Sequence, residues 1–242
     1  MPEDRYDARI AAAYDAWMAD QFRPEVVSAT VDFLSEYADD GRALEFAVGT
    51  GRIALPLSRR GVDVSGIELS PAMVEQLRAK HGSEAIDVTI GDMATTRVGG
   101  TFMLVYLVFN TIMNLQTQDE QVACFQNAAD HLEPGGHFVI EVIVPALQRL
   151  PLGETLVAFD GSDGHAGVDR YDVVNQTLVS RHYFVGDGEV LQEDSPHRYA
   201  YPAEYDLMAK MAGLSLVGRW ADWRREPFTA TSPSHVSVWV KP

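Results

Sequence analysis

The chain has 242 residues, 46% of them apolar and 22% charged, a composition typical of one globular domain with a substantial core. Its formal net charge of −16 and sequence pI of about 4.7 argue against a nucleic-acid partner, because so acidic a surface repels phosphate backbones. A single cysteine, Cys124, and apolar runs well short of ~18 residues indicate a cytoplasmic protein without disulfides or membrane spans.

Helices and strands alternate along the first 145 residues. Residues 6–22 are rich in alanine and predict a helix, and Pro24 opens a second helix that ends near residue 40. Strands are then expected at 43–48, 62–68, 86–90, 101–109 and 137–144, with helices at 52–60, 71–80 and 119–132. This alternation predicts a parallel, doubly wound sheet.

The pattern changes after Pro145. Short alternating runs between residues 156 and 201, with a turn signal at Gly186-Asp187-Gly188, predict an antiparallel β insertion after the fifth strand. A helix at 202–212 and strands at 214–220 and 235–240 complete the chain. Together these elements predict an α/β fold with a mostly parallel seven-stranded sheet.

The most informative stretch runs from Ala43 to Glu68. It reads as a buried strand, a Gly49-Thr50-Gly51 turn, a helix, and a second strand that ends in an acid. The glycines allow a sharp turn and a close backbone approach to a ligand, and the helix start offers free N–H groups. Because the Glu68 carboxylate can accept two hydrogen bonds from ribose hydroxyls, we expect an adenosine-containing cofactor.

Three features decide which cofactor is expected. Residues 49–54 also fit the G-x-G-x-x-G/A pattern of dinucleotide-binding proteins, but that motif alone is a weak signal. Against it, Glu45 lies in the strand before the turn, a Gly91-Asp92-Met93 turn closes the third strand, and the chain ends in helix, strand, strand. These features favour a different nucleoside cofactor over NAD.

Together they resemble the class I S-adenosylmethionine-dependent methyltransferases, whose motif is an acid followed by G-x-G-x-G, here Glu45 to Gly51. The resemblance covers essentially the whole chain and implies S-adenosylmethionine as the cofactor, with Glu68 at the ribose. The first motif glycine is Ala47, a change that costs little only where φ is negative. The candidate cofactor contacts are Tyr14, Ala47, Gly49, Thr50, Gly51, Arg52, Glu68, Leu69, Met73, Asp92, Met93, Phe109 and Asn110.

The family also suggests catalytic positions. Many small-molecule methyltransferases of this class carry a Tyr-Asp pair in an N-terminal helix that covers the cofactor, and Tyr14-Asp15 resembles it. Tyr6 is eight residues earlier, about two turns, so both tyrosines are expected roughly on one face of the helix; the alternative is that they are two aromatic residues that pack on an amphipathic helix. After the fourth strand, Asn110 or Asn114 faces the transferred methyl group, or the Asn110 region caps the next helix. The candidate catalytic residues are Tyr14, Tyr6 and Asn114.

The resemblance divides the chain into N-terminal helices that act as a lid (1–40), a cofactor-binding core (41–145), the antiparallel insertion (146–201), and a C-terminal helix with strands (202–242). Histidines 165, 182 and 197 lie in the insertion, and their spacing matches no metal motif. We therefore expect no metal. For any one of these histidines, a surface or packing position is the more common role.

The function implied by the resemblance is methyl transfer from S-adenosylmethionine to a nitrogen or oxygen of a small molecule. Because the sulfonium methyl is already activated, alignment and exclusion of water are the main tasks of the protein. The chain is similar to methyltransferases of microbial natural-product pathways, including those for amino sugars. Two alternatives are an NAD-linked oxidoreductase, for which no Tyr-x-x-x-Lys pair is evident, and a non-catalytic cofactor-binding protein. The oligomeric state, including a homodimer, is left open.

Overall fold

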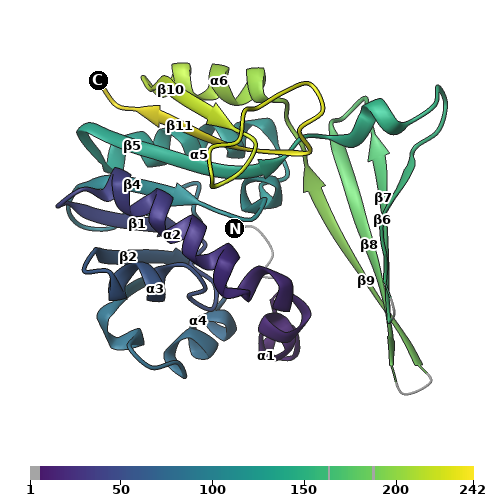
Figure 1. The fold of residues 1–242 in the computed structure, drawn as a ribbon, viewed down its shortest axis with the longest axis horizontal. Coiled ribbons are helices and arrows are strands. Elements are labelled where there is room, and N and C mark those ends of the chain that lie inside the picture. Colours follow the sequence, from purple (N-terminus) through teal and green to yellow (C-terminus); the bar gives the residue numbers. More distant parts are fainter. Residues whose placement is uncertain (1–5, 163, 187–188) are drawn as a thin grey trace.

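Two sheets organise the protein, shown by a computed structural model that describes residues 6–162, 164–186 and 189–242 (Figure 1). A seven-stranded sheet with the order β10-β11-β5-β4-β1-β2-β3 forms the body. A four-stranded antiparallel sheet, β6-β7-β8-β9, stands beside the body and is the predicted insertion. The predicted Gly186-Asp187-Gly188 turn includes two positions, 187 and 188, that lie outside the described residues.

The body sheet confirms the doubly wound prediction. Its strands are β1 (Arg42–Phe46), β2 (Asp63–Glu68), β3 (Asp87–Ile90), β4 (Phe102–Leu107), β5 (Leu132–Ile143), β10 (Ser215–Trp220) and β11 (Ser234–Val240). The first five pair in parallel, whereas β11 runs antiparallel to both β5 and β10. β5 begins five residues earlier than expected, since Leu132 pairs with Phe102.

Helices cover both faces of this sheet. They are α1 (Ala8–Trp17), α2 (Pro24–Ala38), α3 (Ala54–Arg59), α4 (Pro71–Arg78), α5 (Gln118–His131) and α6 (Pro202–Met211), with short 3-10 turns η1 (Ala19–Phe22), η2 (Ser83–Ala85), η3 (Thr111–Asn114) and η4 (Ala146–Arg149). Buried side chains of α2 and α3 form one hydrophobic core, and those of α5 and α6 form the other. Among these described helices, none has the length and apolar character to cross a membrane.

The N-terminal helix is shorter than predicted, because Asp7 caps it. The Asp7 side chain accepts a hydrogen bond from the Ile10 N–H at 2.9 Å, so α1 begins at Ala8. Tyr6 therefore precedes the helix, and the expectation that it shares a helical face with Tyr14 is wrong. The two rings nevertheless meet edge to face, with centroids 5.9 Å apart.

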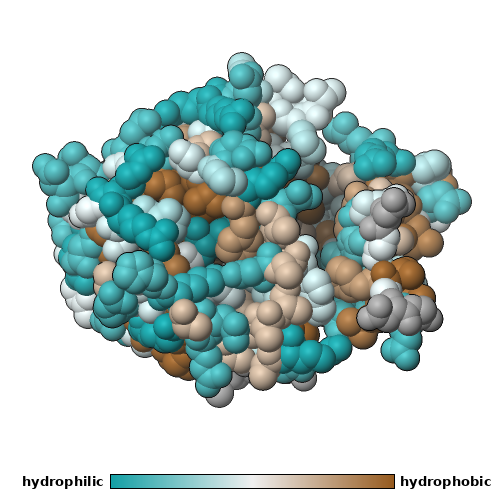
Figure 2. Space-filling model, turned by 60° about the horizontal axis from the view of Figure 1, so that its bottom comes forward, coloured by the Kyte–Doolittle hydropathy of each residue, from teal (hydrophilic) through white to brown (hydrophobic). Residues whose placement is uncertain are grey.

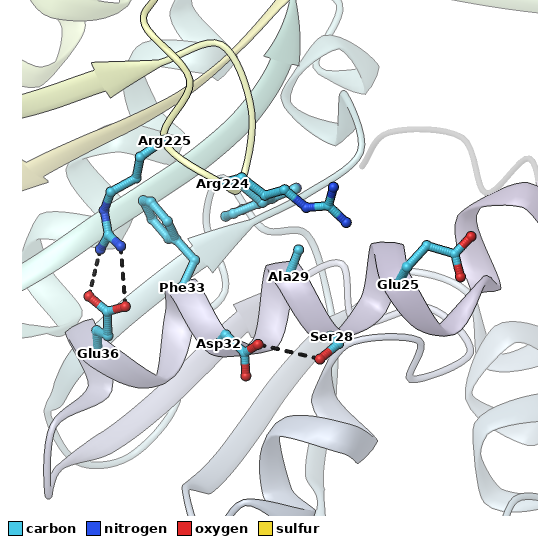
Figure 3. A pocket seen from close by; sticks show the side chains of 9 residues that line it. Glu25, Ser28, Ala29, Asp32, Phe33, Glu36, Arg224 and Arg225 are labelled. Carbon is cyan, nitrogen blue, oxygen red and sulfur yellow. Dashed lines mark hydrogen bonds and ion pairs between the residues drawn. The ribbon is translucent and has the colours of Figure 1, made fainter.

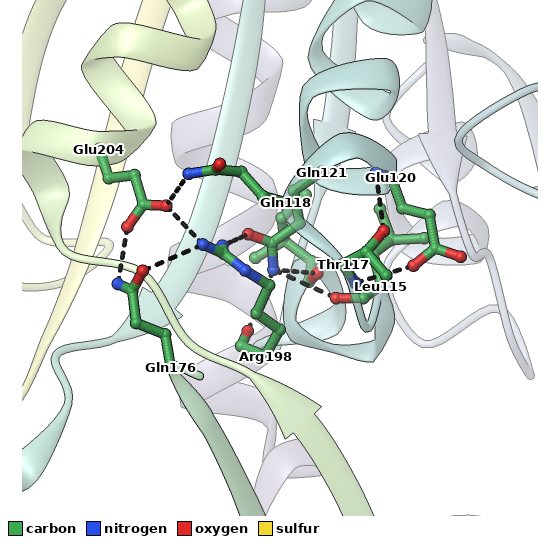
Figure 4. Close-up of polar contacts among 9 residues, drawn as sticks. Leu115, Thr117, Gln118, Glu120, Gln121, Gln176, Arg198 and Glu204 are labelled. Atoms are coloured by element: carbon green, nitrogen blue, oxygen red, sulfur yellow. Dashed lines mark hydrogen bonds and ion pairs between the residues drawn. The ribbon is translucent and has the colours of Figure 1, made fainter. Parts of the chain in front are cut away.

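The inserted sheet comprises β6 (Leu156–Ser162), β7 (His165–Asp172), β8 (Thr177–Gly186) and β9 (Glu189–Arg198). Its last residue, Arg198, is buried and fastens the sheet to the body (Figure 4). The guanidinium donates to Gln121 of α5 at 2.5 Å and to Glu204 of α6 at 2.6 Å, and it also reaches Gln176 at 3.2 Å. One side chain thus joins the base of the insertion to two helices of the core.

Candidate active site

The carboxylate at the end of β2 is held between two backbone donors. Glu68 is 5% exposed, and its Oε2 accepts from the Gly49 N–H at 2.8 Å while Oε1 accepts from the Ser70 N–H at 2.9 Å. Glu68 is therefore fixed in one orientation at the mouth of the glycine turn, as required of a ribose ligand.

The glycine turn adopts left-handed backbone at three positions. The φ angles are +52° at Ala47, +56° at Gly49 and +80° at Gly51. A Cβ at Gly51 would lie 3.1 Å from the Leu55 and Leu77 side chains, so this position requires glycine. Since φ at Ala47 is positive, alanine in place of the first motif glycine lowers the stability of the fold by about 1 kcal/mol.

An ionic contact that the motifs did not reveal ties α1 to this turn. Thr50 Oγ1 donates to Asp15 at 2.6 Å, and Lys80 Nζ lies 2.5 Å from the same carboxylate and 2.8 Å from the Thr50 carbonyl oxygen. Arg52 donates to the Gln21 carbonyl at 3.2 Å. Thus Thr50 and Arg52, predicted as cofactor contacts, also hold the N-terminal segment in place.

The two candidate tyrosines lie near Glu68. The Ser70 hydroxyl donates to the Tyr6 carbonyl at 2.7 Å, which fixes the chain just ahead of α1 at the start of α4. Burial first, then Tyr6, and more weakly Glu68, raise the pKa of Tyr14 far above its ordinary value, although Arg52 opposes the shift. The Tyr14 hydroxyl therefore stays protonated at neutral pH, so it acts as a hydrogen-bond donor and not as a base.

The segment after β4 is held in an unusual conformation by a glutamate that sequence reasoning missed. Phe109 and Asn110 have φ angles of +56° and +62°. Glu141 of β5 accepts from the Phe109 N–H at 2.9 Å and from Trp223 Nε1 at 2.7 Å, and Asn110 Oδ1 accepts from the Ile143 N–H at 2.8 Å. These bonds fix both residues at the carboxyl edge of the sheet.

The alternative in which Asn110 caps the next helix is not what the structure shows. Helix α5 is capped by Thr117 with Glu120 in a reciprocal capping box. Asn114 lies in η3 and is half-buried, and its carbonyl oxygen accepts a hydrogen bond from Gln116 at 3.2 Å. Asn110 occupies the N-cap position of η3, but its side chain makes no capping hydrogen bond there.

The remaining predicted contacts lie around the glycine turn and β3. Asp92 is half-buried, and its Oδ1 accepts from the Ala94 N–H at 2.8 Å, which shapes the turn after β3. Met93 and Met73 are both buried, and Met73 Cε would lie 3.5 Å from a Cβ at Gly49. Leu69 is half-buried between Glu68 and the start of α4.

A second buried carboxyl lies beneath the turn. Glu45 of β1 is 2% exposed and accepts a hydrogen bond from the Tyr106 hydroxyl of β4 at 2.9 Å. Burial raises the pKa of Glu45 to about 8, although the bond from Tyr106 opposes the shift. Glu45 is therefore a neutral acid at pH 7 that supports the turn from within the core.

One face of the inserted sheet is turned toward this site. Alternate residues of β8, from Leu178 through His182 to Phe184, lie on one side, which we call the inner face. Leu178 belongs to the buried core, and Phe184 stacks on Trp17 of α1 with ring centroids 5.0 Å apart. In the space-filling view a furrow separates this sheet from the body (Figure 2). Helix α1 thus joins the glycine turn to the inner face.

A surface pocket of about 340 Å³ lies elsewhere, between α2 and the segment around Arg225 (Figure 3). The Glu36–Arg225 ion pair, at 2.6 Å, closes one end of it. Neither Glu68 nor the glycine turn lines this pocket. It is therefore not part of the candidate active site. Within the residues that the structure describes, no cluster of three histidine, cysteine or acidic side chains is arranged to hold a metal ion.

The Glu68 carboxylate and the glycine turn together fit a nucleoside with a charged tail. A buried, oriented carboxylate lies at the end of β2, and the adjoining turn excludes side chains at Gly51. A family model described as a methyltransferase domain matches residues 43–136. The fold, this match, and 38% identity over nearly the whole chain to a solved methyltransferase together show that the chain belongs to the class I S-adenosylmethionine-dependent methyltransferases, so it is an enzyme that uses S-adenosylmethionine.

Among solved structures, the chain is 38% identical to the CcbJ methyltransferase from Streptomyces caelestis, with a TM-score of 0.87 over 98% of this chain and 97% of that one. It is 29% identical over 197 residues to the cypemycin N-terminal methyltransferase of a Streptomyces species, which covers 80% of each chain. The fold also matches S-adenosylmethionine-bound CalS10, an amino pentose methyltransferase from Micromonospora echinaspora, with a TM-score of 0.71, 23% identity and coverage of 95% and 97%.

Proposed function

We propose that this enzyme methylates an amine nitrogen of a small molecule seated between α1 and the inner face of the inserted sheet. The observation that carries the proposal is the Trp17–Phe184 stack, which joins the two elements opposite the glycine turn. Relatives named as an N-terminal methyltransferase and as an amino pentose methyltransferase support an amine-bearing acceptor. The net charge of −16 suits a cationic acceptor and disfavours nucleic acid.

In this proposal the body holds the cofactor and the two covering elements hold the acceptor. Glu68 binds the ribose hydroxyls, the turn from Ala47 to Gly51 surrounds the methionine part, and Asp92 and Met93 lie beside the adenine. The bound cofactor supplies an activated methyl group. Tyr14, a protonated hydroxyl, orients the acceptor, while the Trp17–Phe184 contact keeps water out. Asn114 and Tyr6 complete the wall of the site.

No step in this scheme needs a metal, and the free, buried Cys124 suits a reducing cytoplasm, where we propose that the enzyme works. The protein thus needs only its own side chains and S-adenosylmethionine. Activity should therefore survive dialysis against EDTA, and loss on dialysis with recovery on adding Mg²⁺ would contradict this part of the proposal.

The acceptor is tested with a panel of matched compounds: glucosamine, the dipeptide Ala-Ala, prolinamide, aniline, and an alcohol analogue of each amine. Transfer of a labelled methyl group from S-adenosylmethionine is measured by mass spectrometry. Amines are expected to be methylated and their alcohol analogues not. Titration calorimetry with S-adenosylhomocysteine and NAD tests the cofactor separately. Methylation of the alcohols alone would overturn the nitrogen assignment.

A further inference from the structure

Three side chains of the inserted sheet form a hydrogen-bonded chain. Asp160 Oδ2 of β6 lies 2.5 Å from His165 Nδ1 of β7, and His165 Nε2 lies 3.0 Å from His182 Nδ1 of β8. His182 Nε2 makes no hydrogen bond to any residue that the structure describes. This series of hydrogen bonds therefore begins at the Asp160 carboxylate and ends at His182 Nε2 on the inner face.

The hydrogen positions in this chain follow from the carboxylate. Asp160 only accepts, so His165 donates from Nδ1 and keeps its lone pair on Nε2. His182 then donates from Nδ1, which leaves a lone pair on its own Nε2. The hydrogen bond from His165 holds the pKa of Asp160 at about 2, and burial, followed by the neighbouring His165, lowers the pKa of His182. At neutral pH Asp160 is therefore ionised, and His182 Nε2 carries the lone pair that can accept a proton.

His182 faces the candidate active site. Its ring stacks with that of Phe184, with centroids 5.9 Å apart, and Phe184 in turn stacks on Trp17. Tyr14 lies one turn before Trp17 on α1, a rise of about 4.5 Å. Tyr14 on α1 and His182 on β8 therefore lie on either side of the Trp17–Phe184 contact.

The inner face also carries negative charge near His182. Glu193 of β9 is directly opposite His182 in the strand register and pairs with Arg9 of α1 at 2.8 Å. One step along the sheet, buried Asp169 accepts a hydrogen bond from Ser180 at 2.6 Å. Because Arg9 offsets the charge of Glu193, Asp169 is the carboxylate of this pair that favours a cationic guest over a neutral or anionic one.

The other charges around His182 are paired. Asp194 and Arg181, on the opposite face of the sheet, bind each other at 2.6 Å. The groups that face the His182 ring are thus Asp160 on β6, His165 on β7, Glu193 on β9 and, through Glu193, Arg9 on α1. Within the described residues, Asp160 is the only carboxylate that the chain of hydrogen bonds connects to His182.

We propose that the inner face binds an alkylammonium acceptor and that His182, held by His165 and Asp160, removes a proton from its nitrogen before methylation. The N–H bond breaks, its electron pair stays on nitrogen, and the proton binds His182 Nε2. The Nδ1 proton of His182 passes to His165 Nε2, so the positive charge comes to rest beside Asp160. This inference rests on the proposed function, because an ammonium has no lone pair with which to accept a methyl group.

The first test needs no acceptor. Long-range ¹H–¹⁵N NMR of histidine-labelled protein at pH 7.5 reports which ring nitrogen carries hydrogen, and His182→Gln and His165→Gln assign the signals. We expect hydrogen on Nδ1 of both rings in the wild type and a redistribution for His182 in Asp160→Asn. Hydrogen on His182 Nε2 in the wild-type protein would overturn the proposal, whatever the acceptor is.

The second test follows the kinetics with Ala-Ala and with aniline, an amine that is neutral at pH 7. His182→Gln is expected to lower kcat for Ala-Ala by about 100-fold at pH 7 and far less for aniline. This loss in kcat should shrink as the pH approaches the pKa of the acceptor amine, since more of the amine is then deprotonated in solution before it binds. Asp160→Asn should give a smaller loss and move the acidic limb to lower pH, because the proton-loaded pair loses its counter-charge.

Two controls separate this inference from the proposed function. The dissociation constant of S-adenosylhomocysteine should be unchanged in each variant, and His81→Gln, on the exposed loop after α4, should behave as wild type. Equal losses for Ala-Ala and aniline, or no loss for either, would overturn the base assignment. A wild-type enzyme that methylates no panel amine would count against the proposed function, while the NMR result would still decide for or against the relay.

Discussion

The cofactor end of the body and the inner face of the inserted sheet differ in how they hold polar groups. At the cofactor end, buried carboxylates are fixed by backbone N–H groups or by core side chains, as Glu68 is by Gly49 and Glu141 is by Phe109. On the inner face, side chains of neighbouring strands bind one another, as His165 binds His182. The first arrangement is set by the fold, whereas the second is set by the choice of side chains.

This difference suggests a division of labour. A cofactor common to a whole family suits a site made largely of backbone, which tolerates substitution poorly. An acceptor that differs between relatives suits a sheet face whose residues change without altering the strands. The inserted sheet must then be held to the body, and the buried hydrogen bonds of Arg198 to Gln121 and Glu204 attach it there.

The junction gives the largest expected effect. Arg198→Met leaves Glu204 and Gln121 without their buried partner, so the free energy of unfolding should fall by about 3–5 kcal/mol in a urea titration. Arg181→Met is the matched control, because its partner Asp194 is on the exposed outer face. There the loss should be much smaller, because solvent screens an exposed ion pair. Equal losses in both variants would show that Arg198 is not a special anchor.

The cofactor end gives the next largest effect. Glu68→Ala should weaken S-adenosylmethionine binding by about 1.5–3 kcal/mol, roughly ten- to a hundredfold in dissociation constant by calorimetry. The physical reason is the loss of an oriented, charged acceptor, which also leaves the Gly49 and Ser70 N–H groups unpaired. Glu75→Ala, at an exposed position of α4, is the control and should bind normally. Unchanged affinity in a folded Glu68→Ala protein would remove the ribose assignment.

Helix α1 lies between the glycine turn and the inner face, and substitution of its Tyr14 should affect turnover more than cofactor binding. Tyr14→Phe is expected to lower kcat about tenfold, equivalent to about 1.4 kcal/mol, with little change in cofactor affinity, since the hydroxyl orients the acceptor. Tyr183→Phe, on the outer face of β8, should have no effect. Hydrogen exchange in α1 should also slow when S-adenosylhomocysteine binds. Normal turnover and unaltered exchange would mean that α1 is only a packing element.

The smallest expected effect is a gain. Ala47→Gly removes a side chain at a φ of +52° and should raise the free energy of unfolding by about 0.5–1 kcal/mol. The same change in a helix, Ala72→Gly in α4, should lower it by a similar amount. A loss at both positions would show that packing of the Ala47 methyl outweighs its backbone strain.

Sequence reasoning predicted the strands and helices around the glycine turn well, because their signals are local. The glycine turn and the acid at Glu68 are each close in sequence to the elements that they join. The same rules contained a signal that was overlooked, since Asp7 is a standard capping residue and predicts a helix that starts at Ala8. Tyr6 was misplaced for that reason.

What escaped prediction depends on pairings between distant residues. Asp15 meets Lys80, and Glu141 meets Trp223, across separations that no motif spans. His165 and His182 were expected to be unremarkable surface or packing residues, because their partnership depends on the register of β7 and β8. A single sequence sets strand periodicity but not that register.

The buried carboxyl of Glu45, beneath the glycine turn, makes the stability of the protein decline as the pH rises. Because the pKa of Glu45 is raised from 4.5 to about 8, the folded state holds a proton there that the unfolded chain releases near its ordinary value. The stability contributed by this group is therefore complete below about pH 4.5 and declines as the pH rises toward about 8. In mildly alkaline solution the turn would rest on a buried negative charge, with the hydroxyl of Tyr106 as its hydrogen-bond donor. Ionisation of Glu45 would then weaken the protein where the glycine turn meets the core.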